Sequence, residues 1–505
     1  MTAGSREGAA TSRRTLITTL AVVSVSQALL LMDTTVVAMA APAIGRDLAA
    51  GIDGLAWIPN AYLMALAGTI PLWGGLGDRW GRWRSFAAGL ALFAAGSLVA
   101  ALAPAVEVLV LGRTLQGIGA AAVFALGMSL LTAVFPADRL GSAMGTWMAV
   151  VGVGMCLGPP LGALVQDEFS WRGMFVINIV VVLVLLAVGW RAVPESRDPQ
   201  RLSADATGGL LFAGAIVAVV TALHLAEGAL LGAGAAPALA LFLVTGILAA
   251  GVVIRERRAR FPVMPPAFFA DRVYRSVLIA ATLVSFAHLG VLYLQTFHLQ
   301  STRGWSPLET GLILLPLSVG IVVGGAVSAP LARRYGERAT ATACLLILLG
   351  GMALLVLLGW GLPSWAIACA NLLVGFGSGV ALPCMSSVAM LAIPRRQAGV
   401  ASATLNTARQ AGAALGIGVL LLTVTAISLL LSPRGIGVPD APLRGTAAAP
   451  LGRTLWSAVT EAAPYSDALA LGAAYGLSAL AVLVATLLAW RGIPARTRRP
   501  ESTPA

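Results

Sequence analysis

The chain has 505 residues, of which 58% are hydrophobic and 11% are charged, and its mean hydropathy is +0.89. A soluble protein carries roughly 25% charged residues, so this composition excludes a soluble globular protein and indicates a polytopic membrane protein. The net charge of +12 accompanies long apolar runs, and we attribute it to membrane topology rather than to nucleic-acid binding.

Fourteen apolar stretches are long enough to cross a bilayer as helices, for which about 20 residues suffice. They do not alternate apolar and polar residues as the strands of a membrane barrel do. The sequence therefore predicts an all-α protein with 14 transmembrane helices. Their approximate cores are residues 15–41, 54–75, 84–104, 106–134, 140–166, 171–191, 206–227, 235–254, 273–299, 308–332, 339–361, 364–391, 398–430 and 467–490.

The arginines predict the orientation of these spans. If the N-terminus is cytoplasmic, 25 of the 33 basic residues fall in cytoplasmic loops and tails, six fall in outside loops, and Arg113 and Arg409 remain within spans. Such a bias is what the positive-inside rule requires. We therefore expect a multi-pass protein of the cytoplasmic membrane, with cytoplasmic tails at residues 1–14 and 491–505.

The first span contains one deep carboxylate, Asp33, in the segment LMDTTVVAMAAP at residues 31–42. A charged side chain in hydrocarbon is costly and usually functional. Arg113, in the segment GRTLQGIGAA of the fourth span, lies at a similar predicted depth and also needs a partner. The sequence predicts that the two residues pair. The pair would either separate when Asp33 takes a proton or permanently clip the two helices together.

The turn after the second span reads GGLGDRWGRWR at residues 74–84. Glycines allow a tight turn with close backbone approach. Asp78 can pair with the neighbouring arginines or reach a helix N-terminus. The glycines and charged residues are spaced more regularly than in an ordinary basic loop. The pattern therefore predicts a conformational-switch turn. Its residues are Gly74, Asp78, Arg79, Gly81 and Arg82.

The fifth span contains glycines at every fourth position, Gly154, Gly158 and Gly162, so they share one helix face. Small residues on one face permit close helix packing in membranes. Pro159 follows the second glycine, and proline removes a backbone donor and kinks a helix. The segment is therefore predicted to pack tightly and bend.

Polar residues in three other spans are candidates for a substrate cavity, because polar groups in a span face a cavity or another helix. In the span at 398–430, Asn406 and Arg409 share a face that Gln410 continues, although Arg409 could instead extend toward the cytoplasmic surface. The remaining candidates are Gln116 in the fourth span and Tyr293, Gln295 and His298 in the ninth. The cysteines and histidines lack metal-ligand spacing, and we expect no metal.

Together these segments resemble the major facilitator superfamily, and more closely its fourteen-helix drug:proton antiporter family of bacterial exporters. The resemblance rests on LMDTTVVAMAAP, GGLGDRWGRWR, GRTLQGIGAA and GMCLGPPLGA, supported by WRGMFVIN at 171–178. It implies two six-helix bundles, at 15–191 and 272–490, the second with an outside loop at 431–466. It also implies a linker region at 192–271 that carries two inserted helices.

The resemblance implies export of an antibiotic or other amphipathic molecule in exchange for protons, by alternating access around a central cavity. The chain would act as a lipid-embedded monomer, with the proton gradient as its energy source and no cofactor. Because Asp33 is the only deep acidic residue, we expect a neutral or singly charged substrate. Two alternatives remain: a symporter that imports a nutrient or peptide, and a membrane receptor or enzyme. The chain lacks a loop long enough for a catalytic domain and lacks the E-x-x-E-R-F motif of peptide symporters.

Overall fold

The computed structural model describes residues 13–50, 52–136, 170–196, 206–230, 234–259, 265–358, 361–393, 398–431 and 464–494, and between them residues 139, 143, 146–147, 150–154, 158, 162 and 164. The predicted all-α fold is confirmed over these residues. The helices are α1 (Arg13–Asp47), α2 (Ile52–Trp80), α3 (Arg82–Ala101), α4 (Val106–Val134), α6 (Arg172–Ala192), α7 (Ala206–Gly228), α8 (Ala236–Arg258), α9 (Pro266–Ala270), α10 (Arg272–Phe297), the π-helical turn η2 (His298–Thr302), α11 (Pro307–Tyr335), α12 (Glu337–Leu355), α13 (Ser364–Ala392), α14 (Ala398–Leu431) and α16 (Pro464–Gly492).

Within the described residues, 12 helices are long and apolar enough to cross a membrane. Helix α2 is not among these 12, but it follows α4 from the contact of Gly54 with Val106 to that of Gly77 with Leu126. Helix α2 therefore spans the same thickness of the bilayer as α4. The predicted fifth span, 140–166, lies largely outside the described residues. The short helix α9 was not predicted from the sequence.

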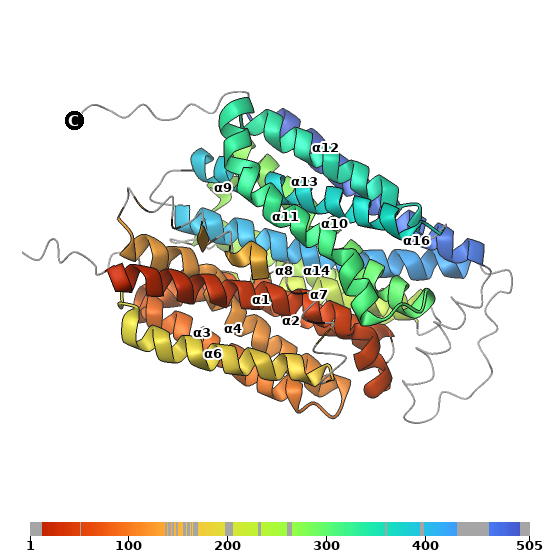
Figure 1. Ribbon diagram of the computed structural model, residues 1–505, viewed down its shortest axis with the longest axis horizontal. Coiled ribbons are helices and arrows are strands. Elements are labelled where there is room, and N and C mark those ends of the chain that lie inside the picture. The colour runs from red at the N-terminus through yellow and green to blue at the C-terminus, as the bar shows by residue number, and fades with distance from the viewer. Residues whose placement is uncertain are drawn as a thin grey trace, which may run out of the picture.

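The long helices run side by side along the length of the molecule (Figure 1). The N-terminal helices α1 to α6 form the lower part of that view, and α10 to α16 form most of the upper part. We call the end at which α1 begins and α2 ends the basal end, and the opposite end the distal end.

Helix pairs in the first half recur in the second half. Helix α4 packs against both α2 and α3, and α13 packs in the same way against both α11 and α12. The two short connections also match, because Gly81 joins α2 to α3 with a φ of 115° and Gly336 joins α11 to α12 with a φ of 83°. Only glycine adopts such backbone angles without steric cost, so these two glycines permit the sharp reversals.

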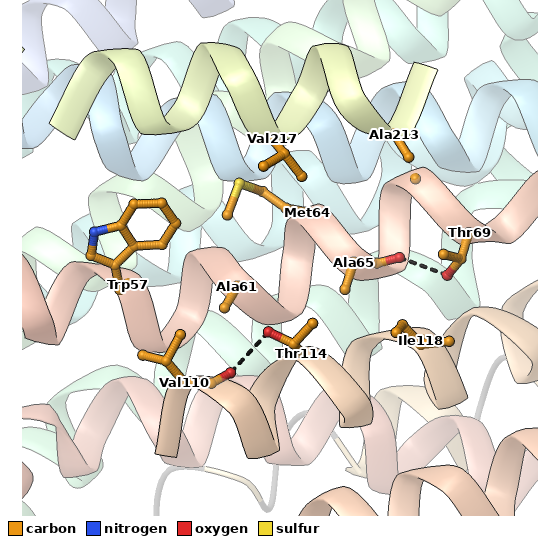
Figure 2. A pocket seen from close by; sticks show the side chains of 11 residues that line it. Trp57, Ala61, Met64, Ala65, Thr69, Val110, Thr114, Ile118, Ala213 and Val217 are labelled. Carbon is orange, nitrogen blue, oxygen red and sulfur yellow. Dashed lines mark hydrogen bonds between the residues drawn. The ribbon is translucent and has the colours of Figure 1, made fainter. Parts of the chain in front are cut away.

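The two helices between the halves occupy different environments. Helix α7 packs against α2 of the first half and α14 of the second half, while α8 packs mainly against α7. Helix α8 is mostly exposed, since only Ala238 and Glu256 of its residues are buried. A cavity of about 310 Å³ lies where α7 meets α2 and α4 (Figure 2).

Candidate functional site

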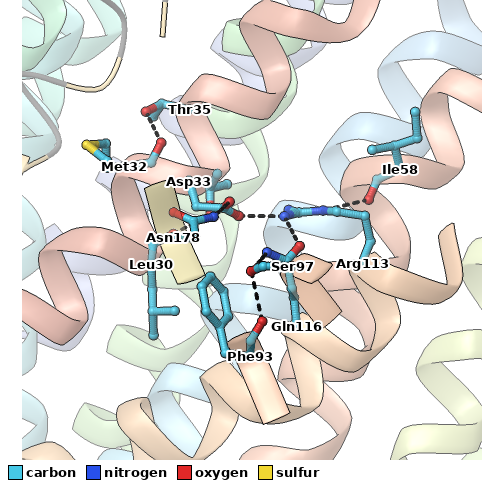
Figure 3. Close-up of polar contacts among 11 residues, drawn as sticks. Leu30, Met32, Asp33, Thr35, Ile58, Phe93, Ser97, Arg113, Gln116 and Asn178 are labelled. Carbon is cyan, nitrogen blue, oxygen red and sulfur yellow. Dashed lines mark hydrogen bonds and ion pairs between the residues drawn. The ribbon is translucent and has the colours of Figure 1, made fainter. Parts of the chain in front are cut away.

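The structure brings Asp33 of α1 and Arg113 of α4 together inside the first half. Arg113 Nη1 lies 2.5 Å from Asp33 Oδ2, and the two residues are 3% and 0% exposed (Figure 3). Separately, either charge would be strongly disfavoured at this depth. The pair neutralises both charges, and its short charge-assisted hydrogen bond is the strong kind.

Arg113 is held by further contacts on α2 and α4. Its Nη1 also donates to Gln116 Oε1 at 2.8 Å, and its Nε donates to the carbonyl oxygen of Ile58 at 3.4 Å. The guanidinium carbon lies 4.4 Å from the centre of the Tyr62 ring, a cation–π contact. These neutral groups can stabilise the guanidinium whether or not Asp33 is charged.

Gln116, predicted as a cavity residue, is placed by the structure in this network. Its Nε2 donates to Ser97 Oγ at 2.7 Å, and that hydroxyl donates to the carbonyl oxygen of Phe93 at 2.8 Å (Figure 3). The chain of hydrogen bonds links α4 to α3. Gln116 is fully buried and has a partner at each end of its amide, so it orients Arg113.

Asn178 of α6 is a site residue that the sequence reasoning missed. Its Nδ2 donates to Asp33 Oδ1 at 2.6 Å. The two oxygens of the Asp33 carboxylate are therefore held by two different helices, α4 and α6. The only signal for Asn178 in the sequence is a polar residue in the otherwise apolar segment that starts α6, at the end of the quoted WRGMFVIN.

The glycines of the predicted fifth span face α1 next to the ion pair. A Cβ atom at Gly154 would lie 2.6 Å from Ala28 Cβ, and one at Gly162 would lie 2.9 Å from Val36 Cγ2. At Gly158 it would lie 2.2 Å from the hydroxyl oxygen of Thr35, two residues after Asp33. Each distance is too short for a side chain, so these glycines permit the close approach. Pro159 lies outside the described residues.

The α2–α3 turn is bound by a residue from a distant segment. Glu195, just after α6, accepts hydrogen bonds from the backbone N–H groups of Trp83 and Arg84, both at 3.1 Å. These are free donors of the first turn of α3, where a carboxylate is favoured. A Cβ at Gly81 would lie 2.4 Å from the Glu195 carboxylate, so the glycine also makes room for this cap. Sequence reasoning missed Glu195.

The other residues of the predicted switch turn are placed differently. Gly74 lies inside α2 with open space beside it, and Arg79 is exposed in the last turn of α2. Arg82 Nη1 donates to the carbonyl oxygen of Ser129 on α4 at 3.5 Å. The side chain of Asp78 lies outside the described part of the structure, so its predicted pairing stays a prediction.

The remaining cavity candidates lie on helices of the second half, and Tyr293 shares a buried cluster with Leu30 and Tyr62 of the first half. Tyr293, Gln295 and His298 are buried on α10 and η2. Gln295 has no hydrogen-bond partner for either amide atom among the described residues, and neither does His298 Nε2. Asn406, Arg409 and Gln410 are half-buried on α14. No cluster of three His, Cys, Asp or Glu side chains able to hold a metal occurs among the described residues.

A salt bridge at the distal end joins α1 to α6. Asp47 Oδ2 accepts from Arg172 Nη1 at 2.5 Å and from Trp171 Nε1 at 3.0 Å, and Arg172 Nη2 donates to the carbonyl oxygen of Ala103. The hydrogen bonds from Arg172, and then from Trp171, lower the pKa of Asp47. The contact therefore joins the end of α1, the α3–α4 connection and the start of α6 at the distal end.

Comparison with known proteins agrees with these features. A sequence profile of the Major Facilitator Superfamily matches residues 23–417. The chain is 34% identical over 436 residues to the multidrug resistance protein Stp of Mycobacterium tuberculosis, covering 85% of this chain and 80% of the relative. It is 35% identical over 409 residues to the tetracenomycin C resistance and export protein of Streptomyces glaucescens, covering 80% of this chain and 74% of the relative.

Among solved structures, the chain is similar to a bacterial homolog of the human lysosomal transporter Spinster in an inward-facing, unoccupied conformation. The TM-score is 0.60 with 18% sequence identity, over 96% of this chain and 99% of the other. At this identity the similarity concerns the fold alone, and it agrees with the helical arrangement described above.

Proposed function

The chain belongs to the Major Facilitator Superfamily, and on that basis we propose that it exports an antibiotic or other amphipathic small molecule in exchange for protons. Two relatives that match most of its length are named for multidrug resistance and for tetracenomycin C resistance and export. The single observation that carries the coupling proposal is the buried carboxylate of Asp33, shared between Arg113 and Asn178.

The geometry suggests how one proton would change the packing. Protonation of Asp33 removes the negative charge that binds Arg113, and the bridge between α1 and α4 weakens. Arg113 keeps its contacts with Gln116, the Ile58 carbonyl and the Tyr62 ring, so the cation remains stabilised on α2 and α4. Helix α1 can then shift relative to α4 within the first bundle, and this shift changes how that bundle rocks against the second. Loss of the proton restores the bridge.

We propose the following arrangement in the membrane. The basal end is cytoplasmic, as are both termini, because the arginines concentrate there. Residues 15–191 and 272–490 form the two moving bundles, and 192–271 links them through α7 and α8. The protein works as a monomer without a cofactor, and the proton gradient supplies the energy. The lack of a second deep carboxylate favours a neutral or singly charged substrate.

Proteoliposomes test this proposal. A susceptibility panel in an efflux-deficient host first identifies an exported compound. Purified protein is then reconstituted with a pH indicator inside, and proton flux is recorded on addition of that compound. We expect Asp33→Asn to abolish the flux, because asparagine cannot take up a proton.

Asp47→Asn is the matched control, since Asp47 lies on the same helix but is half-exposed at the distal end. It should keep the flux. Unchanged flux in Asp33→Asn would refute the coupling role of Asp33. Proton movement in the same direction as the compound would instead indicate a symporter.

A further inference from the structure

The cavity between α2, α4 and α7 has no role in the proposed mechanism. Helix α2 forms its floor, and α4 and α7 form its two walls (Figure 2). Its volume of about 310 Å³ is at the lower end of the range for ligand pockets. We propose that this cavity is a binding site for one acyl chain of a bilayer lipid.

Two contacts between α2 and α7 define the length of the cavity. Near one end, the rings of Trp57 and His224 stack with centroids 4.8 Å apart. At the other, a Cβ at Gly68 would lie only 2.6 Å from Ala213 Cβ. The contacts are 11 residues apart on each helix, or about 16 Å at 1.5 Å per residue. The space between them is therefore held open by contacts at both ends and is not loose packing.

The lining of the cavity favours hydrocarbon. Two threonine hydroxyls line it, and each donates to its own helix: Thr69 to the Ala65 carbonyl at 2.6 Å and Thr114 to the Val110 carbonyl at 2.9 Å. Most other lining groups are apolar. An apolar cavity of about 150 Å³ stays dry and binds benzene, and this one has about twice that volume. It suits a flexible alkyl chain better than water or a polar drug.

The position of the cavity identifies the source of that chain. Val217 of the α7 wall is 44% exposed, and Leu111, next to the lining residue Val110 on α4, is 55% exposed. The α4 wall from Val110 to Ile118 lies about 6 to 18 Å below the start of α4. That depth falls within a hydrocarbon layer about 30 Å thick, where the neighbouring molecules are lipid acyl chains.

The cavity and the ion pair lie on different faces of the same helices. On α2, Ile58 and Tyr62 contact Arg113, whereas Ala61 and Met64 line the cavity. Substitutions at the cavity wall of α7 can therefore fill the space without changing any residue that contacts Arg113.

Photocrosslinking tests the site. The full-length protein is reconstituted in liposomes that contain a phosphatidylcholine with a diazirine in the middle of one acyl chain, and crosslinked peptides are mapped by mass spectrometry. We expect adducts concentrated on residues 57–69 and 213–217. Val217→Phe should lower their share of all adducts about tenfold, equivalent to about 1.4 kcal/mol.

Leu111→Phe is the control, because it adds the same side chain at a similar depth outside the cavity. It should leave the distribution unchanged. If Val217→Phe reduces the yield of folded protein, Thr114→Leu can be used instead. It fills the cavity from α4 and should lower the share of adducts on the cavity residues by the same factor. The proposal would be refuted if the adducts were spread evenly over the exposed helices. It would also be refuted if neither Val217→Phe nor Thr114→Leu changed the share of adducts on the cavity residues.

A second probe distinguishes the source of the chain. A diazirine-bearing long-chain alkane without a headgroup is added to liposomes of unlabelled lipid. If both the alkane and the labelled phospholipid react in the cavity, the lipid assignment stands. If only the alkane reacts there, the occupant is a free lipophile and the lipid assignment is wrong.

Discussion

Arg113 on α4 and Asp33 on α1 form an ion pair of 2.5 Å that is almost completely buried. Removing one partner of a buried pair typically costs about 3 to 5 kcal/mol, because the other charge is left uncompensated. We therefore expect Asp33→Asn and Arg113→Gln each to lower thermal stability in detergent. The double substitution should be less destabilising than the sum of the two.

The same double variant separates a switch from a permanent clip. If the pair only holds α1 to α4, the variant with two neutral partners should recover compound-driven proton flux together with stability. If the pair takes up the transported proton, the double variant should be stable but should show no flux. A stable double variant with full flux would contradict the mechanism proposed above.

The close contact between Gly158 and Thr35 predicts a suppressor. Gly158→Ala should destabilise the protein by about 1 to 3 kcal/mol, the usual cost of overpacking, since its Cβ would lie 2.2 Å from the Thr35 hydroxyl oxygen. Adding Thr35→Ala removes that oxygen and should restore most of the stability. Thermal unfolding measures both. Gly74→Ala, at a position with open space, is the control, and a failure of Thr35→Ala to rescue would argue against this contact.

The cap on α3 predicts a local effect. Glu195→Ala should destabilise the start of α3 by about 1 kcal/mol, the typical value for a lost helix cap. The amides of Trp83 and Arg84, which donate to Glu195, should then exchange hydrogen faster. Exchange measured by mass spectrometry on peptides from α3 checks this, with Glu107→Ala in the exposed first turn of α4 as the control. Unchanged exchange would show that the cap is dispensable.

The distal salt bridge predicts a pH dependence. Arg172 and Trp171 lower the pKa of Asp47 in the folded state, so the bridge contributes stability above the unfolded pKa of about 3.9. That contribution is lost as the pH falls through the lower, folded pKa. The wild type should therefore unfold at a higher temperature than Asp47→Asn at pH 7, and the difference should shrink below about pH 4. Because both side chains are partly exposed, high salt should also reduce the difference.

Several site features could be predicted because their signals are local. Asp33 and Arg113 stand out as charges within apolar runs, and their predicted depths match because both were counted along helices of known rise. The reversal at Gly81 follows from a glycine between two arginine-rich helix ends. The face of Gly154, Gly158 and Gly162 follows from their four-residue spacing.

Other features had no local signal. Asn178 and Glu195 are 145 and 112 residues from the groups that they bind, and one polar residue near a helix end does not identify its partner. Gln116 is a polar residue in a span, as a cavity residue would be, but both ends of its amide are hydrogen-bonded, to Arg113 and to Ser97. Its role depends on which helix lies beside α4.

The amino-acid sequence is enough to establish that this protein is helical and membrane-embedded, and that one carboxylate lies deep in its first span. Hydropathy and arginine placement determine these properties because each segment interacts with the bilayer independently of the others. The tertiary structure alone decided that Asp33 is shared by α4 and α6, that Glu195 caps α3, and that a cavity remains beside α7. Those contacts depend on which helices become neighbours, and packing across the whole chain decides this.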